Sequence, residues 1–237
     1  MTAKGKIYLI PMVIAEDTLQ QVIPKQVLLA LKDIQFFLVE NPRTARRYLS
    51  GLKIYDSIET LSFQVLDKET KASELKVLMT PVLKGNNVGV ISESGCPGVA
   101  DPGSMAVRFA HQNGIAVVPL VGPSSILLAL MASGLNGQSF AFHGYLPVDA
   151  KEAAKAIKEF ERESIDKNQT QLFIETPYRN NKVLDHLLGS LKPTSILSIA
   201  LDITGKSEFI QTKTVRDWKL NKPSLPKEPA IFSFLAF

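Results

Sequence analysis

Cysteine is nearly absent from this sequence, and histidine is rare. The 237 residues include one cysteine, Cys96, and three histidines, His111, His143 and His186. A single thiol excludes a disulfide bond within the chain and a metal site built from cysteines. The histidines show no His-x-x-x-His or His-x-Glu spacing, so we predict no protein-bound metal.

Long apolar runs are absent as well. No window reaches the roughly 18 consecutive apolar residues that span a membrane. The apolar stretch within residues 1–14 is followed by Glu16 and Asp17, without a cleavage pattern of small residues. We therefore expect a cytoplasmic protein that does not enter a membrane.

The sequence also lacks three loop motifs that identify common enzyme classes. It has no Gly-Lys-Ser/Thr of a phosphate-binding loop. The dinucleotide motif Gly-x-Gly-x-x-Gly is missing after the first predicted strand, where the sequence reads Pro11-Met12-Val13-Ile14. Neither Ser94 nor Ser125 stands in a Gly-x-Ser-x-Gly motif. These absences argue against phosphoryl transfer, hydride transfer and serine hydrolysis.

The composition is that of a protein that forms a core, with 45% hydrophobic and 21% charged residues. The length suits one large domain or two of ordinary size. The net charge of +4 is a mild bias, which is compatible with an anionic partner. Basic residues form two clusters, which fit either a solvated helix face or contact with such a partner: Arg43, Arg46 and Arg47, and Lys213, Arg216, Lys219 and Lys222.

The first half of the chain alternates short, continuously apolar strands with helices, a pattern typical of a buried parallel sheet. We expect Pro24 to interrupt the first helix and Ser104 to cap a later one. We also expect strands 88–92 and 115–120 to be parallel neighbours. The expected strands are 6–10, 35–40, 88–92 and 115–120, and the expected helices are 18–33, 42–51, 73–84, 104–113 and 125–134.

The second half has fewer helices, and several strands follow one another directly, which predicts a mixed sheet. We therefore predict two α/β domains, residues 1–138 and residues 139–237. The expected strands of the second are 140–149, 170–175, 194–201, 208–212 and 230–237, and the expected helices are 151–163 and 179–190.

Two loops of the first half have an unusual composition. The stretch "SESGCPGVADPG", residues 92–103, combines three glycines and two prolines directly after a predicted strand. The stretch "VGPSS", residues 121–125, follows the next strand. Parallel sheets bind ligands beyond the carboxyl ends of their strands, where both loops belong. With the carboxylate of Glu93 and bare backbone at Gly95 and Gly98, such a site suits a ligand with a ribose or an amino group.

Four ordered motifs resemble the tetrapyrrole methylase superfamily: "GNNVGVISESGCPGVADPG", "GIAVVPLVGPSSILLALMASGL", "FAFHGYLP" and "LFIETPYR". The resemblance extends over essentially the whole chain. It is strongest to the branch that methylates the ribose 2′-hydroxyl of a cytidine in small-subunit ribosomal RNA. It implies a methyltransferase of two α/β domains, a homodimer, with S-adenosylmethionine in the cleft between the domains.

The resemblance also assigns roles by position. Glu40 or Glu175 is the candidate base that removes a proton from a hydroxyl acceptor. For Asp101 we expect a structural role in its own Pro-Gly turn. The implied cofactor contacts are Pro11, Ser92, Glu93, Ser94, Gly95, Cys96, Ser124, Ser125, Ile174 and Glu175. The implied RNA contacts are Arg43, Arg46, Arg47 and Arg179 on phosphates and Tyr178 on a base.

Several motifs depart from the pattern of the RNA-methylating branch. Its Thr-Pro-x-Gly-Asn is Ile10-Pro11-Met12-Val13-Ile14 here, its Asp-Ala-Gly-Thr-Pro is Glu93-Ser94-Gly95-Cys96-Pro97, and its His-Asn-Glu segment is missing. The cofactor loops persist, whereas substrate-side positions differ. Three interpretations therefore stay open: an RNA 2′-O-methyltransferase, a methyltransferase of a small molecule such as a tetrapyrrole, and a non-catalytic module that binds the cofactor or RNA.

Overall fold

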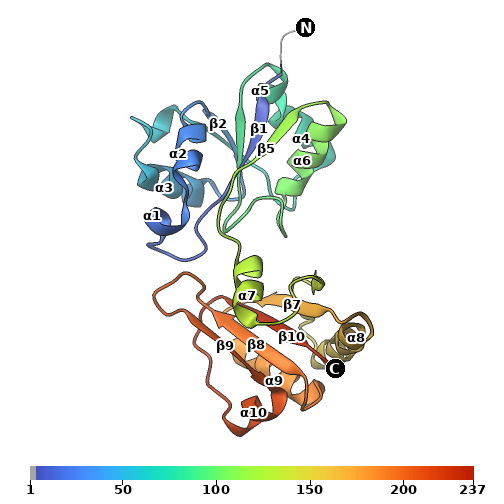
Figure 1. Ribbon diagram of the computed structural model, residues 1–237. Helices are drawn as coiled ribbons and strands as arrows, with labels where there is room; N and C mark the ends of the chain where they lie inside the picture. The colour runs from blue at the N-terminus through green and yellow to red at the C-terminus, as the bar shows by residue number, and fades with distance from the viewer. Residues whose placement is uncertain (1–3) are drawn as a thin grey trace. The chain divides into compact units, whose positions relative to one another are not determined.

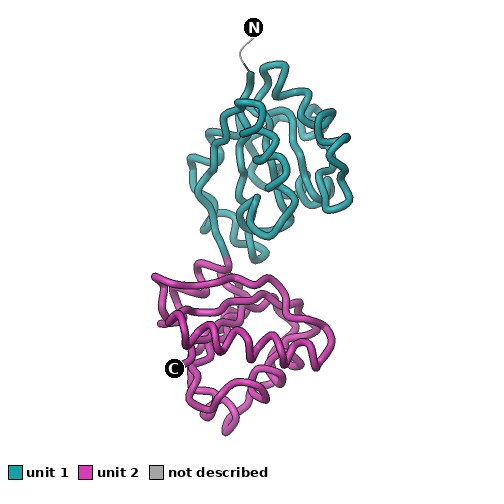
Figure 2. Tube along the Cα trace, turned by 90° about the vertical axis from the view of Figure 1, so that its right-hand side faces the viewer, with its two compact units in different colours: residues 1–124 teal, residues 125–237 magenta. Residues whose placement is uncertain are grey.

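The computed structural model describes residues 4–237, which form two compact units (Figure 2). The first unit ends at Ser124 and the second begins at Ser125. This division comes earlier than the predicted boundary after residue 138, because helix α7 (Ser125–Ser133) packs on the second sheet. Residues 1–3 of the predicted first domain lie outside the described residues.

The first unit contains a five-stranded sheet in the order β3-β2-β4-β1-β5, in which every pairing is parallel. This confirms the predicted parallel sheet. The expectation that strands 88–92 and 115–120 are neighbours is wrong, because β1 lies between them and pairs with both. The strands are β1 (Lys6–Ile10), β2 (Phe36–Val39), β3 (Ser62–Val65), β4 (Val88–Ile91) and β5 (Ala116–Pro119).

Helices cover both faces of this sheet (Figure 1). Ile10 and Phe37 pack with α2 and α3 on one face, whereas Ile7 and Leu38 pack with α4, α5 and α6 on the other. Burial on both faces explains why β2 and β4 carry no polar or charged side chain. The helices are α1 (Leu19–Val22), α2 (Lys25–Leu31), α3 (Pro42–Leu52), α4 (Ala72–Leu78), α5 (Thr80–Leu83) and α6 (Gly103–Gln112), with the 3₁₀ helix η1 (Ile58–Thr60).

Two prolines divide helices that the apolar spacing predicts as continuous. Pro24 is the N-cap residue of α2, so the expected interruption of helix 18–33 is confirmed. Pro81 lies in the first turn of α5, and the expected helix 73–84 is two short helices instead. Proline has no N–H to donate within a helix, and it fits best in a first turn.

The second unit contains a mixed five-stranded sheet in the order β6-β7-β10-β8-β9, as the sequence predicts. β6 and β7 are parallel, and the other pairings are antiparallel. The strands are β6 (Phe140–Phe142), β7 (Thr170–Glu175), β8 (Ile196–Leu201), β9 (Phe209–Thr214) and β10 (Ala230–Leu235), and the remaining helices are α8 (Ala150–Lys167), α9 (Asn180–Ser190) and α10 (Val215–Leu220).

The two faces of the second sheet differ. Phe173, Phe232 and Trp218 belong to a large apolar core that α8, α9 and α10 close. On the opposite face, Thr212 donates a hydrogen bond from Oγ1 to the carbonyl of Ser133 in α7 at 2.9 Å. Side chains alternate between the two faces of a strand, so α7 lies on the face that α8–α10 leave open.

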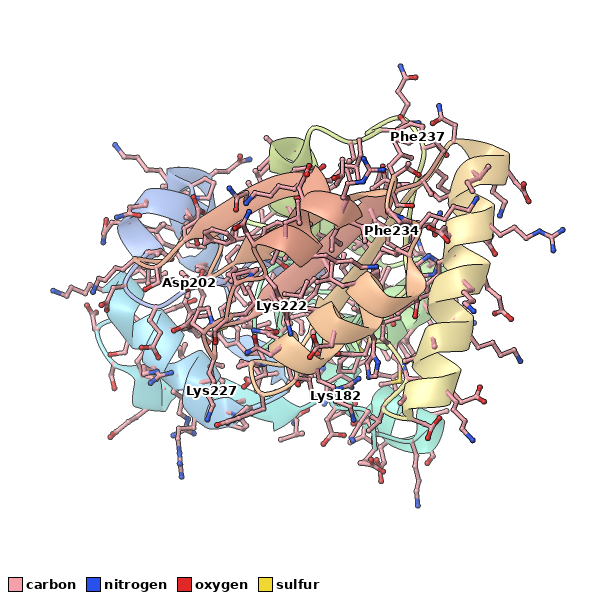
Figure 3. All side chains as sticks on the ribbon, turned by 90° about the horizontal axis from the view of Figure 1, so that it is seen from below. Lys182, Asp202, Lys222, Lys227, Phe234 and Phe237 are labelled. Atoms are coloured by element: carbon pink, nitrogen blue, oxygen red, sulfur yellow. The ribbon has the colours of Figure 1, made fainter. Side chains whose placement is uncertain are left out.

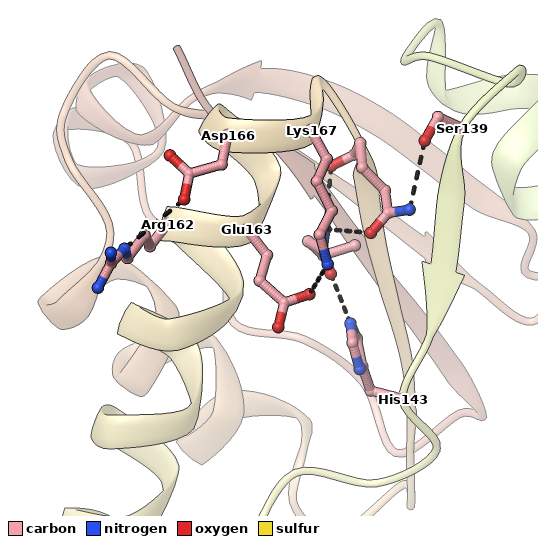
Figure 4. A network of polar contacts seen from close by, with 8 residues as sticks. Ser139, His143, Arg162, Glu163, Asp166 and Lys167 are labelled. Atoms are coloured by element: carbon pink, nitrogen blue, oxygen red, sulfur yellow. Dashed lines mark hydrogen bonds and ion pairs between the residues drawn. The ribbon is translucent and has the colours of Figure 1, made fainter.

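Polar side chains near the β6 edge of this sheet bond to one another (Figure 4). His143 Nε2 lies 2.5 Å from Gln171 Oε1, and its ring stacks on Phe160 with centroids 3.7 Å apart. Gln171 donates to Gln169, which donates in turn to Ser139. These contacts with Gln171 and Phe160 give His143 a structural role in the second unit.

Two negative findings concern residues 4–237. No helix in this range is long and apolar enough to cross a membrane. Within the same range, no three His, Cys, Asp or Glu side chains come together in an arrangement that could hold a metal ion.

Candidate active site

Three loops meet at the carboxyl edge of the first sheet. Met12, directly after β1, donates its N–H to the carbonyl of Gly95 at 2.8 Å. Cys96 lies with its Sγ 3.3 Å from the carbonyl of Pro123, in the loop after β5. The sequence predicted that the glycine-containing loops 92–103 and 121–125 share this edge, and within the first unit the structure has them in contact.

Pro11 is fixed from two sides. A Cβ built on Gly122 would lie 2.0 Å from the Cβ of Pro11, so the backbone of Gly122 passes directly against the proline ring. On another side, the buried Tyr48 of α3 donates its hydroxyl to the carbonyl of Pro11 at 2.7 Å. Burial raises the pKa of Tyr48, which keeps this phenol protonated as a donor.

The loop after β4 holds its glycines in conformations that other residues rarely adopt. Gly95 has φ +67° and Gly98 has φ +86°. A Cβ on Gly95 would make ordinary contacts with Ile14 at 3.4 Å and the Pro123 carbonyl at 3.5 Å, so the strain of a substitution there comes from the positive φ. Ser92 is buried and donates to the carbonyl of Ser94, which itself is exposed. The loop therefore presents backbone and an exposed carboxylate rather than bulky side chains.

Asp101 stabilises this loop. Its Oδ1 accepts hydrogen bonds from the N–H groups of Gly98 at 2.8 Å and Gly103 at 2.7 Å. Helix α6 begins at Gly103, so the expectation that Ser104 caps it is wrong, and Ser104 instead donates to the carbonyl of Asp101. The Oδ2 of Asp101 is buried without a hydrogen-bond partner among the described residues, and burial raises the pKa of this carboxyl.

Glu40 follows β2 at the same edge and lies beside Glu93. Its Oε1 accepts a hydrogen bond from the backbone N–H of Glu93 at 3.2 Å, and Thr44 donates its hydroxyl to Glu93 Oε2 at 3.3 Å. Burial raises the pKa of Glu40 above its ordinary value of 4.5, and the negative charges of Asp101, Glu93 and Asp67 raise it further. A partly buried carboxyl near other carboxylates is a group that holds a proton more readily than a solvated one.

The three arginines of α3 are exposed but do not form one patch. The guanidinium of Arg46 lies over the ring of Phe63 in β3, 5.0 Å from the centroid. Arg47 lines a cavity together with Thr44, which lies three residues earlier on the same face of the helix. Arg46 and Arg47 are adjacent in the sequence and therefore contact different neighbours, because adjacent residues of a helix do not face the same way.

Thr44 and Tyr48 are contributors that the sequence analysis missed. Both are on the face of α3 that lines the cavity, and both bond to loops of the carboxyl edge. A hydroxyl pair at i and i+4 beside the buried Ala45 and Leu49 is the only signal that the sequence carries for them.

In the second unit, Ile174 and Glu175 form the end of β7. Glu175 is 2% exposed. Its Oε1 accepts hydrogen bonds from the N–H and the hydroxyl of Thr176 at 2.7 and 3.1 Å, and its Oε2 lies 3.3 Å from Nη2 of Arg179. Arg179 also donates to the carbonyls of Leu146 and Pro147 at 3.1 Å each. This pair therefore connects β7 to the segment after β6.

Tyr178, next to this pair, points away from the core. Its side chain is 83% exposed, and the ammonium of Lys227 lies over its ring, 5.3 Å from the centroid. Lys227 belongs to the segment that precedes β10, where Lys222 also lies (Figure 3). Of the remaining predicted contacts, Ser124 is the last residue of the first unit and Ser125 begins α7.

Comparison with curated proteins shows relatives with one shared name. The chain is 31% identical over 189 residues to "Ribosomal RNA small subunit methyltransferase I" of Vibrio cholerae, a match of 80% of this chain and 62% of the relative. It is 32% identical over 185 residues to the protein of the same name from Streptococcus pyogenes, a match of 78% of this chain and 60% of the relative. The chain thus spans about three fifths of the length of these relatives. No protein-family model matches it.

Solved structures share the fold at low sequence identity. A uroporphyrin-III C-methyltransferase from Thermus thermophilus has a TM-score of 0.57 at 18% identity, with 98% of this chain and 97% of that chain covered. The methyltransferase CobJ has a TM-score of 0.60 at 17% identity, with 97% and 93% covered. Together with the curated relatives, these structures confirm the resemblance on which the sequence analysis relied.

Proposed function

We propose that this chain, which has the tetrapyrrole methylase fold and is related in sequence to ribosomal RNA small subunit methyltransferase I, is an S-adenosylmethionine-dependent methyltransferase. The proposed acceptor is a ribose 2′-hydroxyl of small-subunit ribosomal RNA. Both the activity and the acceptor are proposals, since the chain spans only 62% of the Vibrio cholerae relative.

The observation that carries the proposal is the carboxyl edge of the first sheet. The loop after β4 presents the exposed side chains of Glu93 and Ser94 there and turns at the buried Gly95, whose φ is +67°. The buried and unpartnered Oδ2 of Asp101 adds an acceptor to the same loop. Backbone groups and a carboxylate oxygen suit the hydroxyl and amino groups of an adenosyl amino acid better than they suit a polyphosphate.

The residues proposed to hold the cofactor in the first unit are Pro11, the run from Ser92 to Cys96, and Ser124. Ser125, Ile174 and Glu175 are the proposed contacts of the second unit. S-adenosylmethionine supplies an electrophilic methyl group when it is bound. The protein's own contribution is to hold the acceptor hydroxyl in line, and positioning of this kind contributes roughly 7–11 kcal/mol in favourable cases.

Glu40 is the proposed base for the acceptor hydroxyl. Its raised pKa makes it a stronger base than a solvated carboxylate, so it accepts the hydroxyl proton more readily. Glu175 was the other candidate from the sequence. We assign it a structural role, because its oxygens already bond to Thr176 and face Arg179.

The mild positive charge of the chain favours RNA as the partner. Arg43 and Arg47 are the proposed phosphate contacts and Tyr178 the proposed base contact, whereas Arg46 and Arg179 are engaged with Phe63 and Glu175. A tetrapyrrole acceptor is the alternative, and the fold shared with a uroporphyrin-III C-methyltransferase supports it. Action in the cytoplasm and as a homodimer is part of the proposal. The location rests on the sequence pattern of residues 1–17 and the lack of a long apolar run, and the homodimer rests on the resemblance.

Two glycine variants test the cofactor site. Gly95→Val and Gly114→Val both introduce a branched side chain at a positive φ, +67° and +61°. Gly114 follows α6, at the amino edge of the sheet. We expect Gly95→Val to be the less stable of the two, because Gly95 is buried and Gly114 is exposed, and among folded molecules only Gly95→Val should weaken S-adenosylmethionine binding in calorimetry, by more than tenfold. Equal cofactor affinity in the two variants, with both folded, would contradict the site.

Methyl transfer itself is tested with labelled S-adenosylmethionine and two acceptors. We expect label in ribosomal small subunits that lack the modification, and none in uroporphyrinogen. Label in the tetrapyrrole alone would establish the alternative. Cofactor binding without label in either acceptor would support the third interpretation, a non-catalytic module. In each case, a control reaction without protein sets the background.

A further inference from the structure

A cavity of about 510 Å³ lies beside the candidate cofactor loop, within the first unit. One wall is the segment after β1, which contributes Met12, Val13 and Leu19. The other wall is α3, which contributes Thr44, Arg47 and Tyr48. Cavities of roughly 300–1,000 Å³ hold ligands of the size of a nucleotide. None of the residues predicted to bind the cofactor lines this cavity.

The cavity carries separated charges. Arg47 and Lys53 contribute positive charge from the α3 side, and Glu16 and Asp17 contribute negative charge from the other wall. None of the three side chains Arg47, Lys53 and Glu16 has an ion-pair partner among residues 4–237. The two cations therefore have free donors for an anionic group. A carboxylate accepts hydrogen bonds from hydroxyl or amino groups, which suits a ribose or the exocyclic amine of a base.

The cavity also joins directly to the edge where methyl transfer is proposed. Thr44 lines it and donates to Glu93, whose N–H donates to Glu40. Met12 lines it and donates to the carbonyl of Gly95. A ligand in the cavity is thus separated from the proposed base by Thr44 and Glu93, and from the proposed cofactor loop by Met12. A strand that occupies the cavity therefore lies close to the edge where methyl transfer is proposed.

We infer that this cavity binds one nucleotide of the RNA acceptor strand, with Arg47 and Lys53 on its phosphate and Glu16 on its ribose or base. The inference rests on the proposed function and specifies its acceptor side. The apolar side chains of Met12 and Leu19 form a surface for the base. A tetrapyrrole with carboxylate side chains fits less well, because Glu16 and Asp17 repel them.

The first test fills the cavity without weakening the helix. Gly51 lines the cavity near the end of α3, and a Cβ there would lie 3.5 Å from Leu19, an ordinary contact. Methionine favours helix formation more than glycine does, so Gly51→Met should unfold at no lower temperature than the wild type. We expect its affinity for a short single-stranded RNA to fall at least tenfold, with S-adenosylmethionine affinity unchanged.

The second test removes the proposed phosphate contact. Arg47→Gln should flatten the slope of log Kd for the same RNA against log salt concentration by about 0.7, the value for one phosphate of a single strand. Arg108→Gln is the matched control, because Arg108 is an exposed arginine of α6, on the opposite face of the sheet. The control should leave the slope unchanged.

The outcomes separate this inference from the proposed function. If the wild type methylates RNA but Gly51→Met binds and methylates it equally well, the cavity is not the nucleotide site. The same conclusion follows if Arg47→Gln and Arg108→Gln change the salt slope equally. If the wild type neither binds the RNA nor methylates ribosomal subunits, the proposed RNA acceptor is wrong, and this inference fails with it.

Discussion

Glu40 and Glu175 occupy equivalent places in the two units, yet their surroundings differ. Glu40 directly follows β2, and Glu175 is the last residue of β7. Glu175 is 2% exposed and bonds to Thr176 and Arg179. Glu40 is only partly buried and accepts one backbone hydrogen bond, from Glu93. The more deeply buried carboxylate is thus the one that already has an ion-pair partner.

The difference teaches that burial alone does not identify a catalytic carboxylate. A carboxylate with its oxygens engaged by Thr176 and Arg179 would have to lose those partners before it could take a proton from a substrate. Glu40 has no cation beside it among residues 4–237 and accepts one backbone hydrogen bond, and burial together with nearby negative charges raises its pKa. Other buried polar groups of the second unit follow the pattern of Glu175, since Glu161 accepts hydrogen bonds from Lys192 and Ser195.

The largest effect expected from this comparison is a decrease in the free energy of unfolding when Arg179 is replaced. Arg179→Ala leaves the carboxylate of Glu175 buried without its cation, which costs about 3–5 kcal/mol of the free energy of unfolding. Urea denaturation measures this loss. Lys182→Ala is the control, because Lys182 is an exposed cation one turn into α9 (Figure 3), and it should change stability by less than about 0.5 kcal/mol. Equal stability of both variants would mean that the Glu175–Arg179 pair is not structural.

The next effect concerns activity rather than stability. Glu40→Gln should reduce methyl transfer by at least about 100-fold, the low end for loss of a general base. In the folded protein the raised pKa makes the charged form of Glu40 unfavourable, so its contribution to stability is lost as pH rises above 4.5. The Gln variant lacks this penalty and should therefore be as stable as the wild type or more stable at neutral pH.

A pH series checks both parts of this prediction. Wild-type activity should increase with pH through a pKa above 4.5, as Glu40 loses its proton, and the stability difference between Gln variant and wild type should increase over the same window. Full activity of Glu40→Gln would mean that another group acts as the base. Glu175→Gln, measured in parallel, should affect stability more than the rate per folded molecule.

Prolines and glycines made much of the fold predictable from the sequence. Pro24 marks the boundary between α1 and α2, and Pro42 stands at the start of α3. Gly95 and Gly98 indicate a loop that can adopt positive φ, and both residues do so. These residues act through local backbone geometry, so a single sequence is enough to interpret them.

The parts that escaped prediction depend on contacts between distant segments. The position of β1 between β4 and β5 is set by pairing across the sheet, and apolar strands of similar length leave the order open. Likewise, nothing in "PRTARRYLSG" shows that Arg46 lies over Phe63 or that Thr44 bonds to Glu93. The sequence therefore indicated the loops that we propose to bind the cofactor, whose glycines and prolines act locally. It did not indicate the neighbouring cavity, which depends on contacts between distant segments.

The smallest effect is expected at Tyr178, which lies between Glu175 and Arg179 in the sequence but takes no part in their ion pair. Since its side chain is 83% exposed, Tyr178→Ala should change the free energy of unfolding by less than about 0.5 kcal/mol. Loss of a stacked base should weaken RNA binding by about 1 kcal/mol, roughly fivefold. Tyr145→Ala, at a tyrosine that is 57% exposed in the same unit, is the control and should leave RNA affinity unchanged. If titrations give the same affinity for both variants, Tyr178 is a solvated side chain, and the RNA contacts belong to the first unit alone.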